Sequence, residues 1–310
     1  MSALAGKAVV ITGAGRGIGA ACAKGAAAQG AAVVVNDVDG GEADAVVAAI
    51  IAAGGRAIAC VADITDWHDA GRPIASCIEA FGRIDGLVNN AGLFHMGLLT
   101  DFAPQAARSL IEVNVLGAFH CAAHAVKPML AQRSGSIVNV TSGAHLGNPA
   151  MGVYGASKGA IASMTYIWAM ELADSGVRVN ALSPLAQTRM MTDTADYARS
   201  HGGDPSRFMD VQPPEANAPV VEYLLSDRAA GITGQIVRID RDELALYAHP
   251  AIQMPSVKGD GNGWTIESIA EAFDRDLRQR LMPCGILGTT GRAAPLDSGL
   301  RRQDAGKGER

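Results

Sequence analysis

The sequence has no excess of basic residues, which argues against a nucleic acid or a membrane surface as a partner. It holds 26 Lys and Arg against 31 Asp and Glu, for a formal net charge of −5. Acidic and basic residues are interspersed, so no basic stripe is present to attract a polyanion. We therefore expect a small-molecule partner, with no nucleic acid and no membrane.

Cysteines in paired or metal-type spacing are also absent. The chain has 5 cysteines, an odd number, and none of them forms a close pair. Such a pattern is typical of buried thiols in a reducing compartment, so we expect a cytoplasmic protein without disulfides. The positions are Cys22, Cys60, Cys77, Cys121 and Cys284.

Long apolar runs are the third absence. The first residues, "MSALAGKAVVITG", have no basic flank followed by a long apolar segment. Later in the chain no uncharged stretch reaches the roughly 18 residues that a membrane-spanning helix needs. The sequence thus predicts neither an export signal nor a membrane span.

What the chain does contain is a regular alternation of short β-branched runs and longer alanine-rich segments. At 310 residues and 48% hydrophobic composition it can bury a large core. This alternation predicts an α/β fold, a single Rossmann-type doubly wound sheet of mostly parallel strands with helices on both faces. The predicted strands are "AVVIT" at Ala8, "AAVVVND" at Ala31, "RAIACVAD" at Arg56, "IDGLVNN" at Ile84, "GSIVNVTS" at Gly135, "GVRVNALSP" at Gly176 and "GQIVRI" at Gly234.

Composition shifts divide the chain into regions. Residues 1–240 form the predicted nucleotide-binding and catalytic domain, in which residues 185–214 break the rhythm and suggest a long, structureless substrate lid. Residues 241–310 hold one amphipathic segment from Trp264 and a polar tail from about Gly291, too little for a second core. We therefore treat 241–310 as a C-terminal extension.

A glycine-rich loop follows the first predicted strand. "VVITGAGRGIGAA" places Gly13, Gly17 and Gly19 where a strand passes into a helix. Glycines let the backbone turn tightly and approach a pyrophosphate, whose charge then faces the free amides of the helix N-terminus. Taken alone, the glycine loop has an alternative interpretation, in which the glycines serve only the packing of a strand-to-helix turn and bind no ligand.

Two charged residues bear on the choice of dinucleotide. Asp37 closes the second strand about twenty residues after the loop, where a carboxylate can accept from the adenine ribose hydroxyls and repel a 2′-phosphate. Arg16 argues the other way, because a guanidinium in the loop can meet that phosphate. We favour NAD over NADP as the cofactor. The alternative interpretation of Asp37 is that it is only a turn residue with no role in cofactor binding. Asp63, at the end of the third strand, is predicted to meet the adenine edge or to cap a helix.

A tyrosine and a lysine at helical spacing indicate proton chemistry. Tyr154 and Lys158 are four residues apart, so on a helix they share a face. A nearby ammonium favours the phenolate, and we expect it to lower the pKa of the tyrosine and make the phenol a usable acid and base. Ser142 precedes them and can hold a substrate oxygen, whereas Asn114 is a weak helix former within a predicted helix.

Taken in order, these motifs resemble the classical short-chain dehydrogenase/reductase family from about Gly6 to Ile239. The resemblance implies a catalytic tetrad in which Tyr154 moves the proton and Ser142 orients the substrate. Lys158 is then expected to bind the nicotinamide ribose and Asn114 to hold a relay water. The family also implies a homotetramer or homodimer and further cofactor contacts at Ile18, Ile64, Asn89, Asn90, Ala91, Gly92, Pro184 and Thr188.

A partial resemblance concerns the substrate. "VVVND", "SPLAQTRM" and the extension are similar to the branch of the family that oxidises hydroxyacyl-CoA thioesters, including steroid-degrading enzymes. The chain departs from the family at Pro184-Leu185, where Pro-Gly is usual, which makes the Thr188 assignment weaker than the tetrad. The implied reaction interconverts a secondary alcohol and a ketone with NAD.

Other functions remain as alternatives. One alternative is a lyase or dehalogenase on the same fold, and another is a non-catalytic dinucleotide-binding protein. Either would explain the predicted fold, but neither requires the full set of catalytic motifs. His120 and His124 lie four residues apart beside Cys121, but no further ligand stands at a suitable spacing, so we predict no metal.

Overall fold

The computed structural model describes residues 2–202, 204–208, 211–259, 261 and 263–282. Residues up to Tyr247 form one compact unit, and the described residues from Ala248 form a second. The predicted extension thus begins within the first unit, because residues just after 240 add a strand to its sheet. Cys284 and the polar tail lie outside the described residues.

The first unit is a single twisted sheet with the strand order β3-β2-β1-β4-β5-β6-β7-β8. Every predicted strand is present, and β1 to β7 pair in parallel, whereas β8 runs antiparallel to β7. The winding reverses between β1 and β4, which are neighbours in the sheet. The strands are β1 (Ala8–Ile11), β2 (Ala32–Asp37), β3 (Arg56–Val61), β4 (Gly86–Asn89), β5 (Gly135–Val140), β6 (Val177–Ser183), β7 (Ile236–Asp240) and β8 (Glu243–Leu246).

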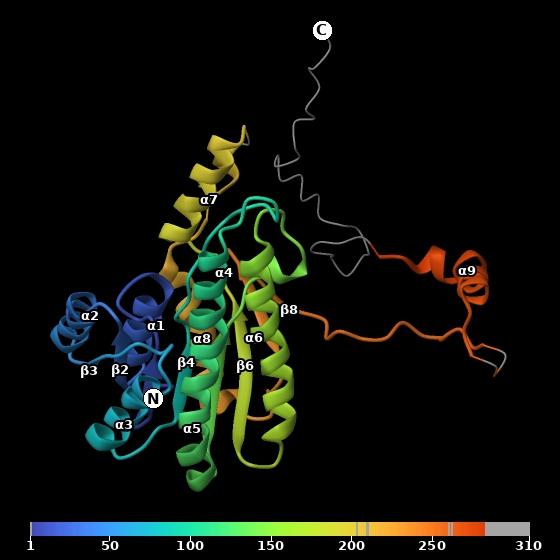
Figure 1. Ribbon diagram of the computed structural model, residues 1–310. Helices are drawn as coiled ribbons and strands as arrows, with labels where there is room; N and C mark the ends of the chain where they lie inside the picture. The colour runs from blue at the N-terminus through green and yellow to red at the C-terminus, as the bar shows by residue number, and fades with distance from the viewer. Residues whose placement is uncertain (1, 203, 209–210, 260, 262, 283–310) are drawn as a thin grey trace. The chain divides into compact units, whose positions relative to one another are not determined.

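Helices cover both faces of this sheet, as the alternation predicts. One hydrophobic core lies between the sheet and α1, α2 and α8, and a second lies between the sheet and α3, α5 and α6. In Figure 1 the green helices α4, α5 and α6 stand in front of the strands. The helices of this unit are α1 (Gly17–Ala28), α2 (Gly40–Ala52), α3 (Trp67–Phe81), α4 (Pro104–Ile111), α5 (Ala118–Gln132), α6 (Gly152–Glu171), α7 (Arg189–Ser200) and α8 (Ala218–Leu225).

One helical segment, Pro104–Gln132, is long and apolar enough to cross a membrane by length and composition alone. Core helices pass the same test. Cys121, Ala125 and Met129 of this segment are buried against the sheet in the second core. These side chains pack against the sheet as those of a core helix do.

The lid differs from its prediction. Residues 185–214 are not one structureless loop, because α7 (Arg189–Ser200) and a short 3-10 turn at Pro205–Phe208 lie within them. α7 buries Thr194, Ala195 and Ala198 at a spacing that fits one helix face. The glycines and prolines that suggested a loop stand at 202, 203, 205, 213 and 214, after this helix.

The second unit contains α9 (Ile266–Arg275), followed by a 3-10 turn at Leu277–Arg280. Thr265 caps α9 reciprocally with Ser268, which starts the helix at that point. The amphipathic segment predicted from Trp264 is thus a helix, and its packing against the rest of the protein stays a prediction.

Truncations separate the two parts of the extension. A chain that ends after Ile239 should show a lower melting temperature, because it lacks β8 and its hydrogen bonds to β7. A chain that ends after Tyr247 keeps this strand and removes only the second unit. If the chain that ends after Tyr247 has the melting temperature and the oligomer size of the full chain, α9 does not pack on the body or on a neighbouring subunit.

Candidate active site

The predicted site residues gather at the carboxyl edge of the parallel sheet. The glycine loop follows β1, Asp37 ends β2, "NNAG" ends β4, and Ser142 follows β5. In open α/β sheets this edge, beside the point where the winding reverses, is where ligands bind. The topology therefore brings together motifs that lie far apart in the sequence.

The glycine loop has the geometry that a pyrophosphate requires. Gly13 and Gly17 have φ of +58° and +54°, in the left-handed region that favours glycine. A Cβ on Gly13 would lie 2.7 Å from the Cα of Ala91, so the loop also packs directly on the segment after β4. α1 begins at Gly17 with no acidic residue in its first turn, which leaves its amides to face an anion.

Asn90 and Thr12 brace this loop. The amide Nδ2 of Asn90 donates to the carbonyls of Thr12 and Gly13, both at 2.9 Å. In return, the hydroxyl of Thr12 accepts from the backbone amides of Asn90 and Ala91 at 3.1 Å. The side chain of Asn90 thus holds the loop in place, and any contact of its own with a cofactor stays a prediction.

Asp37 lies beside the glycine loop. Its Oδ2 accepts from the amide of Gly15 at 2.9 Å, and its Oδ1 accepts from the amide of Asp39 at 3.1 Å. Both bonds hold the half-buried carboxylate at the loop. Contact of Asp37 with an adenine ribose stays a prediction. The bond from the Asp39 amide to Oδ1 is the kind that a turn residue makes, so the alternative interpretation of Asp37 as a turn residue holds for this one oxygen.

Arg16 is held by acidic neighbours. Its guanidinium pairs with Asp39 and with the Oε1 of Glu42 at 3.2 Å. The hydrogen bond that Arg16 donates to Glu42 holds the pKa of Arg16 above its ordinary value. A cavity of about 320 Å³ adjoins these side chains and is also lined by Gly15, Gly17, Ala20, Ala21, Lys24, Ala45, Val46, Pro214 and Glu215.

Asp63 is engaged within its own turn. Its Oδ1 accepts from the amide of Thr65 at 2.9 Å and from the hydroxyl of Thr65 at 2.8 Å. Asp66 rather than Asp63 caps α3. Ile64 is 5% exposed, and its carbonyl bonds to a ring nitrogen of His120. Contacts of Asp63 and Ile64 with a cofactor stay predictions.

Tyr154 and Lys158 share the buried face of α6. The exposed fractions of the two residues are 8% and 4%, and the Nζ of Lys158 lies 5.8 Å from the centroid of the Tyr154 ring. Nζ donates to the carbonyl of Val140 at 2.9 Å. The lysine is therefore fixed beside the end of β5 rather than in direct contact with the phenol oxygen.

The pKa of Tyr154 does not follow the sequence-based expectation. Burial raises it to about 12, and the hydrogen bond with Ser142 opposes that rise only in part. Burial also lowers the pKa of Lys158 to about 8. The expected lowering of the tyrosine pKa by the ammonium is thus not found in this structure, because desolvation of the buried phenol has the largest effect on that pKa.

Asn114 lies close to Lys158 and is held by several hydrogen bonds. Asn114 lies in a π-helical turn, Glu112–Gly117, between α4 and α5, and is 1% exposed. Its Oδ1 accepts from the amide of Leu93 at 2.7 Å, and its Nδ2 donates to the Leu93 carbonyl and to the hydroxyl of Ser157, both at 3.0 Å. A Cβ on Gly92 would lie 3.4 Å from Asn114 Oδ1 and 3.5 Å from Lys158 Nζ, so these two side chains meet beside Gly92.

A cluster of apolar side chains beside Tyr154 was not anticipated from the sequence. The ring of Phe94 stands edge-on to that of Tyr154 with centroids 4.9 Å apart. Met96, Phe102 and Leu110 pack into the same cluster. The apolar letters in "GLFHMGLL", directly after the cofactor motif, were the available signal. We name this set of residues the apolar wall.

The lid starts at the cofactor side of the site. Thr188 precedes α7, and its Cγ2 would lie 3.7 Å from a Cβ on Gly17. The carbonyl of Leu185, the residue that replaces the usual glycine after Pro184, accepts from the side-chain amides of Gln212 at 3.0 Å and Asn217 at 3.2 Å. The two ends of the lid are thereby tied together at its base.

The pair of histidines on α5 is accounted for without a metal. Ring nitrogens of His120 and His124 bond to the carbonyls of Ile64 and Trp67, at 3.1 Å and 2.9 Å. Within the part of the chain that the structure describes, no group of three or more His, Cys, Asp or Glu is suited to a metal ion.

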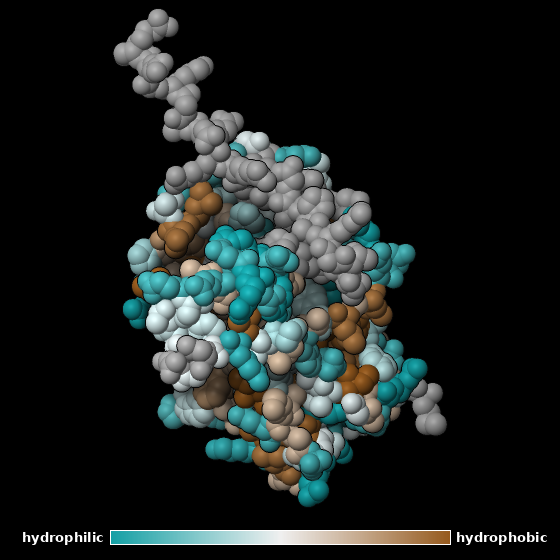
Figure 2. All heavy atoms as spheres, turned by 90° about the vertical axis from the view of Figure 1, so that its right-hand side faces the viewer, coloured by the Kyte–Doolittle hydropathy of each residue, from teal (hydrophilic) through white to brown (hydrophobic). Residues whose placement is uncertain are grey.

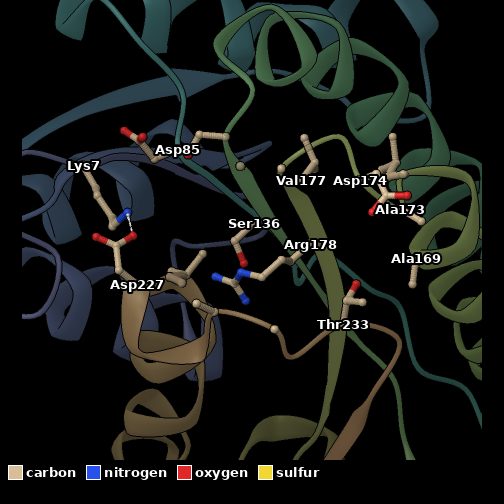
Figure 3. Close-up of a pocket in the computed structure, with 17 residues that line it drawn as sticks. Lys7, Asp85, Ser136, Ala169, Ala173, Asp174, Val177, Arg178, Asp227 and Thr233 are labelled. Carbon is tan, nitrogen blue, oxygen red and sulfur yellow. Dashed lines mark hydrogen bonds and ion pairs between the residues drawn. The ribbon is translucent and has the colours of Figure 1, made fainter.

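A larger cavity, of about 430 Å³, lies at the other edge of the sheet, where β5 and β6 begin. Figure 3 shows Arg178 at its centre, near Ser136, with Lys7 and Asp227 paired on one side. Arg178 donates to the carbonyls of Leu224 at 2.8 Å and Ser226 at 3.2 Å, at the C-terminal end of α8. None of the predicted site residues lines this cavity.

The chain matches the family model for short chain dehydrogenases over residues 7–199. A 3-oxoacyl-[acyl-carrier-protein] reductase of Synechocystis sp. is 39% identical over 244 residues, 77% of this chain and 98% of that protein. A 2-(S)-hydroxypropyl-CoM dehydrogenase of Xanthobacter autotrophicus is 36% identical over 246 residues, 77% of this chain and 96% of that one.

Solved structures agree. A short chain dehydrogenase from Mycobacterium avium superposes with a TM-score of 0.78 at 32% identity, and the match covers 91% of this chain and 98% of that one. An NAD+-bound xylitol dehydrogenase gives a TM-score of 0.72 at 30% identity over 76% and 98% of the two chains.

Proposed function

The chain belongs to the short-chain dehydrogenase/reductase family, and from that premise we propose that it is an NAD-dependent dehydrogenase of secondary alcohols. It is an oxidoreductase with an NAD(P) dinucleotide as cofactor. The proposal adds the choice of NAD, the roles of the tetrad and the class of substrate. The observation that carries it is the burial of Tyr154 and Lys158 on one helix face, with the side chain of Ser142 near enough to the phenol to lower its pKa.

The residues at the sheet edge fit a dinucleotide. In this proposal the amides of the glycine loop and of the start of α1 bind the pyrophosphate, and Asp37 binds the adenine ribose. Lys158 binds the nicotinamide ribose, and Thr188 contacts the carboxamide. Held by these residues, NAD would supply the hydride acceptor for oxidation of the carbinol carbon.

The protein's own part in the reaction is to hold and move a proton. Ser142 Oγ accepts from the amide of Ala144 at 3.2 Å, so its own hydrogen is free to donate to the substrate oxygen or to the phenol. In ketone reduction the neutral phenol of Tyr154 gives its proton to the substrate oxygen. In alcohol oxidation Oη takes the hydroxyl proton while the phenol's own proton leaves through Lys158 and the relay water. Asn114, held at three points, provides a fixed amide beside Lys158 for the relay water.

The apolar wall supports a substrate with a substantial apolar part. Phe94 and Met96 cover one side of Tyr154, so apolar atoms next to the reacting carbon gain burial there. A relative named 3-oxoacyl-[acyl-carrier-protein] reductase supports a substrate that carries an acyl chain. We propose a 3-hydroxyacyl thioester or a steroid-like alcohol. We do not favour a lyase or a dehalogenase, because such relatives lose the glycine loop or replace the lysine, and this chain keeps both.

A substrate panel tests this function. Purified protein is mixed with NAD and with short and long 3-hydroxyacyl thioesters, hydroxysteroids, xylitol and propan-2-ol, and NADH absorbance is followed. We expect the long thioesters or steroids to give the highest kcat/KM, because they fill the apolar wall. If only the polyol is oxidised, the substrate class is wrong. If no alcohol is oxidised and no ketone is reduced, the proposed activity itself is wrong.

The cofactor preference is expected to depend on Asp37. The protein should bind NAD at least about tenfold more tightly than NADP, because a carboxylate repels the 2′-phosphate. Asp37→Ala should narrow that gap, chiefly by strengthening NADP binding. Arg16 does not offset the repulsion, since Asp39 and Glu42 already pair with it. Calorimetric titration of both cofactors measures the effect, with Asp44→Ala on the same side of the sheet as the control. Equal affinities in the unmodified protein would refute the assignment.

We also propose a homotetramer or homodimer in the cytoplasm. Large apolar side chains are exposed on α6, where Ile167 is 52% and Met170 79% exposed. Leu116 and Phe119 add to this on the π-helical turn and α5. Figure 2 shows apolar patches separated by hydrophilic side chains on one face. Subunit contacts remove such surface from water. The four described cysteines are all free and buried, as suits a reducing compartment.

A further inference from the structure

His145 and Tyr247 contact each other beside the Ser142 turn, outside the cofactor site. We propose that they act as a positioning pair, in which Tyr247 packs against the His145 ring and His145 holds the backbone of Ser142. The segment after β7 then helps to set the orientation of the hydroxyl that binds the substrate oxygen. This inference rests on the proposed dehydrogenase function, since it assigns Ser142 a part in that reaction.

The first contact is between His145 and Ser142. His145 lies on the short 3-10 turn Gly143–Leu146, and its Nδ1 forms a short hydrogen bond with the carbonyl of Ser142. A carbonyl can only accept, so Nδ1 is the ring nitrogen that carries the proton. The same turn holds the hydroxyl of Ser142 through the amide of Ala144 at 3.2 Å. Both polar ends of Ser142 are thus fixed by its own turn.

The turn packs directly against α6, the helix that carries Tyr154. A Cβ on Gly155 would lie 2.8 Å from the carbonyl of Ala144, and one on Gly159 would lie 3.7 Å from the Cβ of His145. These glycines flank Tyr154 and Lys158 in the sequence. With so little space, a shift of the turn changes the spacing between Ser142 and Tyr154.

The second contact is between His145 and Tyr247. Tyr247 follows β8, and its backbone amide donates to the carbonyl of Ile236 at 3.0 Å, while its hydroxyl bonds to that of Ser183 at 3.0 Å. Its ring lies 5.5 Å from the ring of His145, centroid to centroid, at an angle of 54°. Tyr247 is thus held at both ends and forms a fixed wall against the imidazole.

Paired substitutions at His145 test this role. His145→Phe keeps a ring against Tyr247 and removes the donor, whereas His145→Asn removes the ring and places an amide donor near the Nδ1 position. We expect His145→Phe to lower kcat by about tenfold, as for one lost hydrogen bond, with NAD affinity unchanged by calorimetry. His145→Asn should recover most of that loss. A loss of kcat that is the same in both variants, or that follows their melting temperatures, would overturn the proposal.

Tyr247 is tested in the same background. Tyr247→Ala should lower kcat to a similar degree as His145→Phe, and the double variant should fall no further than the lower single variant, because the two residues act in series. Tyr247→Phe keeps the ring and should retain near-normal kcat. Additive losses in the double variant would show that the two residues act independently and would refute the pair.

Nuclear magnetic resonance separates this inference from the proposed function. The hydrogen-bonded Nδ1 proton of His145 should give a protected downfield signal in the cofactor-free protein. The signal should be absent in His145→Asn and lost or exchange-broadened in Tyr247→Ala. This result supports the pair even if no alcohol proves to be a substrate, which would count against the function alone. Dehydrogenase activity with no such signal would refute the pair and leave the function standing.

Discussion

Replacing Tyr154 by phenylalanine should lower turnover by about a hundredfold or more, while the fold and the affinity for NAD survive. The substitution removes only the hydroxyl that exchanges the proton. The ring keeps its edge-on contact with Phe94 and its place in the apolar wall. Burial already holds the phenol neutral, with a pKa raised to about 12, so no buried charge is lost with the oxygen. Single-turnover kinetics, calorimetry with NAD and a melting curve measure the three quantities.

The control for this variant is Tyr223→Phe. Tyr223 lies on α8, away from the site, and is 41% exposed. It should leave turnover, NAD affinity and melting temperature unchanged. Near-normal turnover in Tyr154→Phe on the best substrate would show that the proton is handled elsewhere.

Replacing Lys158 by methionine should damage both turnover and NAD binding. We expect turnover to fall by about a hundredfold and the NAD dissociation constant to rise at least about tenfold, because the ammonium is assigned to the nicotinamide ribose as well as to the phenol's surroundings. The matched control is Lys127→Met on α5, which removes the same charge from an exposed position outside the tetrad. A variant that loses turnover but keeps full NAD affinity would refute the ribose contact.

Lys158→Met should also change how stability depends on pH. Burial lowers the pKa of Lys158 from 10.5 to about 8, so between these values the unfolded chain binds more protons than the folded one. Stability contributed by this site therefore rises with pH across that window, and the penalty for burying the charge is fully present below about pH 8. Methionine has no such penalty, which is on the order of a few kcal/mol.

The expected observation is a difference between two stability curves. The stability of Lys158→Met relative to the unmodified protein should be highest below about pH 8 and should decline as the pH rises towards 10.5. The Val140 carbonyl loses its donor in the variant, and this cost is independent of pH. Denaturant unfolding of the cofactor-free proteins at several pH values measures the difference. A difference that does not vary with pH would mean that Lys158 titrates normally in the folded state.

The fold and the list of site residues could be predicted from the sequence because they depend on local patterns. β-branched runs ending in Asp37 or Asn89 identify buried parallel strands, and glycines after β1 identify a turn that passes into a helix. Tyr154 and Lys158 share a helix face because of their spacing alone. Each of these signals lies within a few residues of the chain.

The lid shows where local signals fail. Glycines and prolines around residues 202–214 suggested one long loop, but α7 precedes them and is stabilised by a buried face that alternates with polar residues. The ties from Gln212 and Asn217 to the Leu185 carbonyl join residues far apart in the sequence. No propensity of a single segment indicates such a bond.

The sequence by itself determined the order of strands along the chain, the glycine loop, the residues of the proposed tetrad and the family. Only the tertiary structure decided the surroundings of those residues: the burial that raises the pKa of Tyr154, the neighbours that pair with Arg16, and the contact of Tyr247 with His145. The physical reason is that desolvation and packing depend on which distant segments exclude water from a side chain. Residue type and spacing place a group on its element, whereas the packed elements around it set its charge and its partners.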